Sequence, residues 1–254
     1  MRVRNPVAAK WRAGQTSVGT WLNLVSPMVA ELLATEGFEW LVVDMQHPPW
    51  SFSEAVNAFR AIEACGAVPF ARSWSHAPEV IARILDAGAL GIVAPRVSTR
   101  RQAVLLAEAV RYPPKGQRAQ GEGRAILARD YYAVADENVL LIAQIEDVEG
   151  VKNIDEIMSV EGIDAGFIGP GDLALSMGLP REEASKVPEF QNALLRIRDG
   201  CRRANKPAGI PAATADAANK WLAEGFQFIS LASDLRFLRA AASRELKEVK
   251  FDRS

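Results

Sequence analysis

Two carboxylates and an amide stand at the ends of two short apolar segments in the middle of the chain. The first segment, LLIAQIE at residues 140–146, contains Gln144 and Glu146, and the second, AGFIG at 165–169, is followed closely by Asp172. Carboxylate oxygens suit Mg²⁺ and Mn²⁺, and such ions need few protein ligands because they keep waters and bind substrate oxygens. An acid after a strand can also cap the next helix, but the residues considered next favour a hard-cation site.

An arginine and a histidine stand at the ends of two other apolar segments. Arg72 closes AVPFAR, where a charge is costly unless it meets solvent or an anion. A salt bridge would satisfy it, but a guanidinium there could also hold an anionic substrate and stabilise an oxyanion. His47 follows the strand-like segment in VVDMQHPPW and is a candidate third ligand or general base. His76, the only other histidine, is better explained as a helix-entry residue.

Eight short apolar segments alternate with longer amphipathic ones along the chain. They are Ser17–Leu22, Trp40–Asp44, Ala67–Arg72, Leu90–Pro95, Leu140–Glu146, Ala165–Gly169, Pro207–Ile210 and Phe226–Leu231. Such segments, bounded by Gly or Pro, are typical of strands buried on both faces. Eight strands alternating with helices over about 250 residues, with no linker, predict an α/β fold with a single (β/α)₈ TIM barrel across residues 1–254. The stretch Tyr112–Asn138 is interpreted as a functional loop with a minor helix.

In such a barrel, polar residues at the carboxyl ends of the strands face one shared mouth. In chain order, these residues are Trp21, Asp44, His47, Arg72, Arg96, Gln144, Glu146 and Asp172. Asp86 precedes the fourth strand, so the pattern alone places it at a helix end, away from this mouth. None of the eight segments contains the inward-facing lysine that a Schiff-base aldolase requires. If the site carries out aldol chemistry, the pattern therefore favours an enolate intermediate stabilised by a metal over an iminium formed on a lysine.

The composition excludes several classes of partner. Thirty basic and thirty-one acidic side chains give a net charge of −1, so nothing suggests a nucleic-acid partner. Cys65 and Cys201 lie far apart and outside any CxxC motif, which favours free thiols in a reducing compartment. The first residues lack a signal-peptide pattern, and no segment approaches the roughly 20 apolar residues of a membrane span. We therefore expect a cytoplasmic protein without a membrane partner.

Motifs spread over nearly the whole chain resemble the HpcH/HpaI-type (4-hydroxy-2-oxoheptanedioate) aldolases. The motifs are GTWL (19–22), VVDMQHPP (42–49), PFAR (69–72), DAGALGIVAPRV (86–97), YPPKGQR (112–118), AQIED (143–147) and GFIGPGDLALSMG (166–178). The resemblance implies a class II, metal-dependent pyruvate aldolase on a TIM barrel. It implies reversible cleavage of a 4-hydroxy-2-oxo acid to pyruvate and an aldehyde, with oxaloacetate decarboxylation by the same enolate site as the alternative. A catalytically silent scaffold is disfavoured because the residues that the chemistry needs are present.

The resemblance also implies roles for the pocket that receives pyruvate. Glu146 and Asp172 match the ligands of a divalent metal, Mg²⁺ or Mn²⁺, with Co²⁺ or Zn²⁺ as further candidates. Gln144 matches the amide that bonds to the metal's water shell. Trp21 matches the aromatic side chain lining the pyruvate pocket, and Gly171 lies in the loop whose backbone receives the carboxylate. Substrate contacts are thus expected from these residues.

The remaining implied roles concern catalysis and assembly. Arg72 matches the arginine that stabilises the enolate, His47 the histidine of the acid–base machinery, and Asp86 the aspartate paired with that histidine. The last role disagrees with the pattern-based position of Asp86, and the resemblance is preferred here. The family forms homo-oligomers, with dimers built into hexamers through swapped terminal helices. The amphipathic segment Leu235–Val249 is compatible with such a swap and equally with a helix that packs on its own barrel.

Two departures from the family pattern concern the aldehyde side of the pocket. Gln46 stands where many members have Glu before the histidine, and the loop 120–123 lacks the usual arrangement around an arginine, with Arg118 and Arg124 on its two sides. These departures leave the identity of the aldehyde open.

Overall fold

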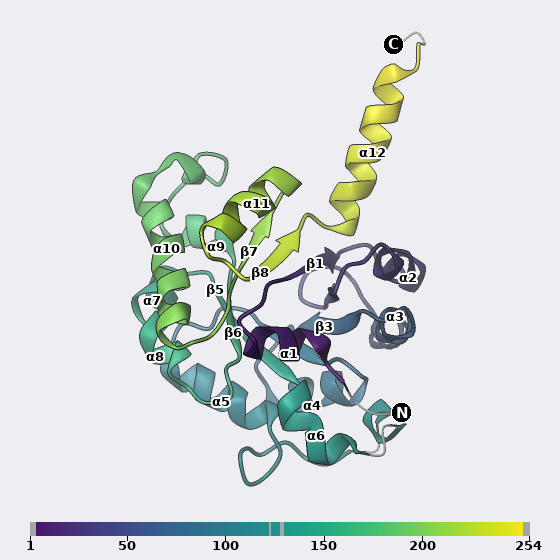
Figure 1. The fold of residues 1–254 in the computed structure, drawn as a ribbon, viewed down its shortest axis with the longest axis vertical. Helices are drawn as coiled ribbons and strands as arrows, with labels where there is room; N and C mark the ends of the chain where they lie inside the picture. The colour runs from purple at the N-terminus through teal and green to yellow at the C-terminus, as the bar shows by residue number, and fades with distance from the viewer. Residues whose placement is uncertain (1–3, 122, 128–129, 251–254) are drawn as a thin grey trace.

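The computed structural model describes residues 4–121, 123–127 and 130–250, and its strands close into a parallel eight-stranded barrel in chain order (Figure 1). The strands are β1 (Ser17–Leu22), β2 (Trp40–Asp44), β3 (Val68–Arg72), β4 (Gly91–Ala94), β5 (Leu140–Ile145), β6 (Ala165–Ile168), β7 (Ala208–Ala212) and β8 (Phe228–Leu231). The predicted TIM barrel is confirmed, and each predicted strand lies within two residues of an observed one at both ends.

Most helices lie between successive strands and cover the outside of the barrel, whereas the first precedes β1 and the last follows β8 (Figure 1). They are α1 (Pro6–Arg12), α2 (Pro27–Thr35), α3 (Phe52–Ala64), α4 (Pro78–Asp86), α5 (Arg100–Val110), α6 (Tyr131–Asn138), α7 (Val148–Lys152), α8 (Ile154–Met158), α9 (Pro170–Ser176), α10 (Pro188–Arg203), α11 (Ala215–Ala223) and α12 (Asp234–Glu248), with the 3₁₀ turns η1 (Arg124–Leu127) and η2 (Ala184–Lys186). None of the described helices has both the length and the apolarity to cross a membrane.

The inside of the barrel is filled by large side chains from alternate strand positions. Trp40 of β2, Phe70 of β3 and Phe228 of β8 are fully or almost fully buried, and their rings stack or tilt against one another. Helix α1, which precedes the first strand, adds Trp11, whose ring centroid lies 4.7 Å from that of Phe228. The interior is therefore a packed core that α1 continues below β1 and β8, and the strand pattern did not predict this helix.

The long segment after α5 lies at the opposite end of the barrel from the carboxyl ends of the strands, because it leads from a helix back into β5. The buried guanidinium of Arg118 lies over the ring of Tyr112, donates a hydrogen bond to the hydroxyl of Tyr131, and is ion-paired with Asp86 at 2.7 Å. Arg124 is ion-paired with Glu63 of α3. Neither arginine borders the barrel mouth of its own chain, so the expectation that both lie on the aldehyde side of the pocket is wrong within one chain.

Helix α12 differs from the other helices because most of its length extends away from the barrel (Figure 1). Only Asp234, its first residue, is buried, and this carboxylate accepts hydrogen bonds from the backbone N–H groups of Asn23 and Leu24. Leu235 and Leu238 are 41% and 58% exposed. The helix is thus anchored to the barrel at its first turn, and it presents apolar side chains to the surroundings.

Candidate active site

The site is built from the inward-facing side chains at the carboxyl ends of the strands. Side chains alternate between the two faces of a strand, so the residue two positions beyond an inward-facing side chain also faces the interior of the barrel. Trp40 and Val42 of β2 fill the barrel core, and Asp44 follows on the same face. On β5, Leu140 and Ile142 belong to that core, and Gln144 and Glu146 continue the alternation. The two-residue period of the strands therefore places these polar side chains above the apolar core of the barrel.

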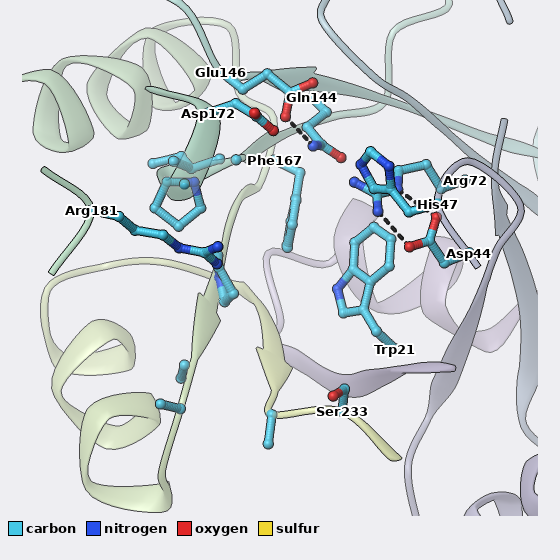
Figure 2. Close-up of a pocket in the computed structure, with 18 of the residues that line it drawn as sticks. Trp21, Asp44, His47, Arg72, Gln144, Glu146, Phe167, Asp172, Arg181 and Ser233 are labelled. Atoms are coloured by element: carbon cyan, nitrogen blue, oxygen red, sulfur yellow. Dashed lines mark hydrogen bonds and ion pairs between the residues drawn. The ribbon is translucent and has the colours of Figure 1, made fainter. Parts of the chain in front are cut away.

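These groups line a pocket of about 600 Å³ at the carboxyl end of the barrel (Figure 2). Of the residues predicted from the sequence, the pocket is lined by Trp21, His47, Arg72, Gln144, Glu146, Gly171 and Asp172. In Figure 2, Glu146 and Asp172 lie together on one side, and Arg72 and Asp44 lie on another. Asp44, also expected at the mouth, lines the pocket as well, whereas Arg96 and Asp86 are absent from the lining. The sequence thus predicted the membership of the pocket with two exceptions.

Two hydrogen bonds hold the carboxylate of Glu146 in place, and a glycine leaves room for it. The amide nitrogen of Gln144 donates a hydrogen bond to Oε2, and the backbone N–H of Arg96 donates to Oε1 at 2.8 Å. Arg96 reaches that position with a left-handed backbone (φ 53°), which is uncommon for a residue with a side chain. A Cβ on Gly169 would lie only 2.3 Å from Oε2, so glycine is required there. The backbone around this carboxylate is therefore shaped to fit it.

Burial makes ionisation of Glu146 costly. The pKa of Glu146 is raised to about 6, chiefly by desolvation and also by the charge of Asp172, although the hydrogen bond from Gln144 and the charge of Arg72 act to lower it. The side-chain oxygen of Gln144 is buried and lacks a hydrogen-bond partner in the described structure. The described residues contain no group of three or more His, Cys, Asp or Glu side chains arranged to hold a metal. Two carboxylates and an unpartnered amide oxygen suit a hard cation that keeps several waters.

The opposite side of the pocket is organised around Arg72. Its Nε and Nη2 donate to the two oxygens of Asp44 at 2.8 and 2.5 Å, and its guanidinium lies 4.7 Å from the ring centroid of Trp21. Asp44 is fully buried, while the Arg72 side chain keeps 12% of its surface exposed. The rim salt bridge considered from the sequence therefore exists, and the same guanidinium also lines the pocket. Ion pairing and substrate binding are compatible because the arginine retains free donors.

His47 and Asp86 do not meet within one chain. His47 lines the pocket, is exposed, and forms no hydrogen bond with another described residue. Asp86 is the last residue of α4, so it lies at the amino-terminal end of the strands, bound to Arg118. The predicted pairing of these two side chains is thus not formed in the single chain, and the pattern-based placement of Asp86 describes its position correctly.

Sequence reasoning gave no role to three other residues of the site. Asp44 ends a strand and follows the inward alternation, so the period-two pattern could have identified it as the partner of Arg72. Arg181, in the loop after α9, and Arg236, in the first turn of α12, also line the pocket. Neither belongs to a strand end, and a lone arginine in a loop or helix carries no pattern that marks it as part of a site.

Comparison with known proteins identifies the family. Residues 17–241 match the family model described as HpcH/HpaI aldolase/citrate lyase. The chain is 40% identical over 248 residues to the hydroxypyruvate/pyruvate aldolase of Rhizorhabdus wittichii (strain RW1), covering 97% of this chain and 99% of that protein. It is 33% identical over 247 residues to the 2-keto-3-deoxy-L-rhamnonate aldolase of Escherichia coli (strain K12), covering 95% and 92%.

A solved structure supports the same relationship. The crystal structure of an HpcH/HpaI aldolase/citrate lyase family protein from Burkholderia cenocepacia J2315 superposes with a TM-score of 0.90 at 31% identity, covering 96% of this chain and 99% of that one. The fold, the chain length and the sequence of this protein therefore all agree with those of the family members. The chain belongs to the HpcH/HpaI aldolase/citrate lyase family and is an aldolase, a carbon–carbon lyase.

Proposed function

We propose that the chain catalyses reversible aldol cleavage of a 4-hydroxy-2-oxo acid to pyruvate and an aldehyde. The observation that carries this proposal is the pocket itself, where the Glu146 and Asp172 carboxylates share one cavity with the Arg72 guanidinium. Relatives named as aldolases of hydroxypyruvate, pyruvate and 2-keto-3-deoxy-L-rhamnonate support a 2-oxo acid as the substrate.

Glu146 and Asp172 would hold the divalent metal, Mg²⁺ or Mn²⁺ in the first instance and Co²⁺ or Zn²⁺ as further candidates. A bound cation would relieve the repulsion between the two carboxylates and would favour ionised Glu146, whose pKa is raised by burial. The unpartnered oxygen of Gln144 is suited to accept a hydrogen bond from a water of the ion. When bound, the ion supplies Lewis-acid polarisation of the substrate's 2-oxo group.

The remaining catalytic and binding roles belong to side chains and backbone groups of the pocket. Arg72 donates hydrogen bonds to the C2 oxygen as negative charge grows there during cleavage of the C3–C4 bond, whose electron pair becomes that of the enolate. His47 takes the proton of the C4 hydroxyl, so that C4 leaves as an aldehyde carbonyl. Trp21 forms a wall of the pyruvate pocket, and the backbone at Gly171 receives the carboxylate.

Asp86 can assist His47 only if a second copy of the chain brings it there, because the two residues lie at opposite ends of one barrel. Such a site would be shared across a two-fold interface. Co-expressing His47→Ala with Asp86→Ala tests this: a shared dyad restores about a quarter of wild-type activity to the whole preparation, because about half of the pairs are mixed and one of the two sites in each mixed pair is intact. No recovery in the mixture would exclude a dyad shared between chains.

We infer that a homo-oligomer, built from dimers and up to a hexamer, covers the exposed leucines of α12. Leu235 and Leu238 lie on the helix that extends from the barrel, where a second copy could cover them (Figure 1). Light scattering coupled to size-exclusion chromatography would measure the assembly. Leu238→Glu should shift it toward smaller species, whereas Arg239→Glu, at the neighbouring position, serves as the control for the added charge.

The decisive experiment compares metal binding with catalysis. Glu146→Ala and Asp172→Ala should each abolish Mn²⁺ binding in calorimetry and cleavage of 4-hydroxy-2-oxo acids, while circular dichroism shows a folded protein. Wild-type metal affinity in both variants would refute the assignment. Oxaloacetate assayed beside the hydroxy-oxo acid separates the aldolase from the alternative, a decarboxylase that uses the same enolate site.

A further inference from the structure

His76 lies in the loop from β3 to α4, outside the lining of the pocket. It precedes α4 as the sequence suggested, but no described side chain caps the start of that helix at Pro78. The ring instead reaches across to the next strand, where its Nε2 lies 2.6 Å from the carbonyl oxygen of Pro95, directly after β4. A carbonyl oxygen can only accept a hydrogen bond, so this nitrogen carries a proton and donates it. Pro95 is buried, and its carbonyl therefore needs such a partner.

The carbonyl of Pro95 and the N–H of Arg96 belong to one planar peptide group. That N–H donates to Oε1 of Glu146 at 2.8 Å. The same peptide group is thus bound at its oxygen by His76 and at its nitrogen by Glu146. In a trans peptide the two groups point in opposite directions, so the orientation that satisfies the imidazole also aims the N–H at the carboxylate. A hydrogen bond to the carbonyl also polarises the peptide and strengthens its N–H as a donor.

The backbone conformation of Arg96 explains why this peptide needs a second support. Its φ of 53° is left-handed, a region that a residue with a Cβ disfavours. The N–H of the next residue, Val97, donates to the carbonyl of Gln144 at 3.0 Å, so the chain is held on that side. A flip of the peptide between Pro95 and Arg96 is then the local motion that returns φ to a negative value. Strained conformations of this kind persist where their surroundings over-determine them.

A flipped peptide would disturb the site that the proposed function assigns to the metal. Glu146 would lose one of its two hydrogen bonds and would face the carbonyl oxygen of Pro95 in place of the N–H of Arg96. The hydrogen bond from Gln144 alone would leave the carboxylate free to turn away from Asp172. The carbonyl dipole would also repel its negative charge. The orientation of this peptide therefore controls how well the two carboxylates are arranged for one cation.

We propose that His76 is a positioning residue for the metal site. Its hydrogen bond to Pro95 holds the peptide in the orientation in which the N–H of Arg96 binds Glu146. The inference rests on the proposed function and adds to it a residue that contacts neither the substrate nor the metal ligands. The role requires a hydrogen-bond donor at the place of Nε2 and no charge. Substitutions that keep this donor should preserve metal affinity, and substitutions that remove it should not.

The test compares Mn²⁺ affinity, measured by calorimetry on metal-free protein. His76→Phe keeps a ring without the donor, and it should bind Mn²⁺ about 3–10-fold more weakly, as the loss of one hydrogen bond implies. His76→Ala, which lacks the donor and adds no bulk, should show the same loss. His76→Gln places an amide N–H near the position of Nε2 and should bind close to the wild type. Ser75→Ala is the matched control, because it removes a hydrogen bond from the N–H of Ala77 within the same loop. It should leave the affinity unchanged.

A double variant tests the role of the left-handed backbone. Glycine adopts positive φ without the penalty of a Cβ, so Arg96→Gly removes the preference for the flipped peptide. His76→Phe should therefore weaken Mn²⁺ binding less in the Arg96→Gly background than in the wild-type background. A crystal structure of metal-free His76→Phe should show the peptide flipped. At saturating Mn²⁺, kcat for aldol cleavage in His76→Phe should return close to the wild-type value, because His76 contacts no reacting group.

Several outcomes would overturn the inference and leave the proposed function intact. Wild-type Mn²⁺ affinity in the folded His76→Phe and His76→Ala proteins is one of them. An equal loss in His76→Gln or in Ser75→Ala would attribute the effect to the loop as a whole. Equal losses in both Arg96 backgrounds, or a kcat that stays low at saturating Mn²⁺, would contradict an action through this peptide. A wild-type protein without Mn²⁺ affinity would refute the metal site of the proposed function and the inference together.

Discussion

Asp44 and Arg72 stand opposite each other in the register of β2 and β3, and their side chains form two hydrogen bonds at the top of the barrel core. Two parallel contacts fix the plane of the guanidinium as well as its position. Trp21 packs against one face of that plane. The remaining N–H groups of Arg72 therefore have a set direction before any substrate arrives, and in the proposed mechanism this preorganisation reduces the cost of binding the enolate oxygen.

Asp44→Asn should consequently impair catalysis without removing any group that touches the substrate. The amide can accept only one of the two hydrogen bonds, so Arg72 loses its fixed plane. We expect kcat for aldol cleavage to fall about 10–100-fold, within the range for a displaced transition-state donor. Thermal unfolding should also occur at a lower temperature, because removal of one partner from a buried ion pair is destabilising. Steady-state kinetics with unchanged kcat would show that the orientation of Arg72 is not important.

Substitutions of Arg72 and of His47 should impair different steps of the reaction. Arg72→Lys keeps the charge but loses the planar fork, so both aldol cleavage and pyruvate proton exchange should fall, by about 10²–10³-fold. His47→Ala should reduce aldol cleavage more than oxaloacetate decarboxylation, because only cleavage requires removal of a C4 hydroxyl proton. The two reactions are compared by steady-state kinetics in each variant. Equal losses in His47→Ala with intact metal content would assign His47 a positioning role.

The pKa of Glu146 predicts a stability effect whose sign depends on metal. Burial raises this pKa from 4.5 to about 6, so ionisation of Glu146 destabilises the metal-free fold above pH 6, and the penalty disappears below pH 4.5. Metal-free Glu146→Gln should therefore be more stable than wild type at pH 8, by up to about 2 kcal/mol, and nearly equal to it at pH 4.5. Saturating Mn²⁺ at pH 8 should reverse the order, because only the wild type binds it well. Differential scanning calorimetry at both pH values, with and without Mn²⁺, measures these differences.

Chemical trapping distinguishes an enolate from an iminium. No lysine lines the pocket in the described structure, so a Schiff base with pyruvate has no candidate amine there. EDTA should abolish activity, and Mn²⁺ should restore it. Borohydride added with pyruvate should leave the activity and the intact mass unchanged. A covalent pyruvate adduct on any lysine, detected by mass spectrometry, would contradict the proposed mechanism.

The barrel could be predicted from the sequence because its strands are short apolar segments with helical segments between them. This pattern is local in the sequence, so it can be recognised without knowledge of tertiary contacts. It also predicted most of the pocket, since strand ends in a barrel converge by topology. Arg181 could not be predicted, because its place depends on how a loop folds over Gly171. The family resemblance assigned Asp86 to the barrel mouth as the partner of His47. The chain direction of α4 instead places Asp86 at the opposite end of the barrel, where His47 is out of reach within one chain. Helix α1 was missed because its packing under the barrel depends on contacts of Trp11 with residues far away in sequence.

The packed floor beneath the pocket has a kinetic consequence. The aromatic core of Trp40, Phe70 and Phe228, with Trp11 below it, leaves no route through the barrel axis, so both products must leave by the mouth. Pyruvate lies at the buried end in the proposed function, and the aldehyde lies between it and solvent. We therefore expect an ordered release in which the aldehyde departs first and pyruvate last. Pyruvate should then inhibit cleavage competitively against the hydroxy-oxo acid, and the aldehyde should inhibit it non-competitively.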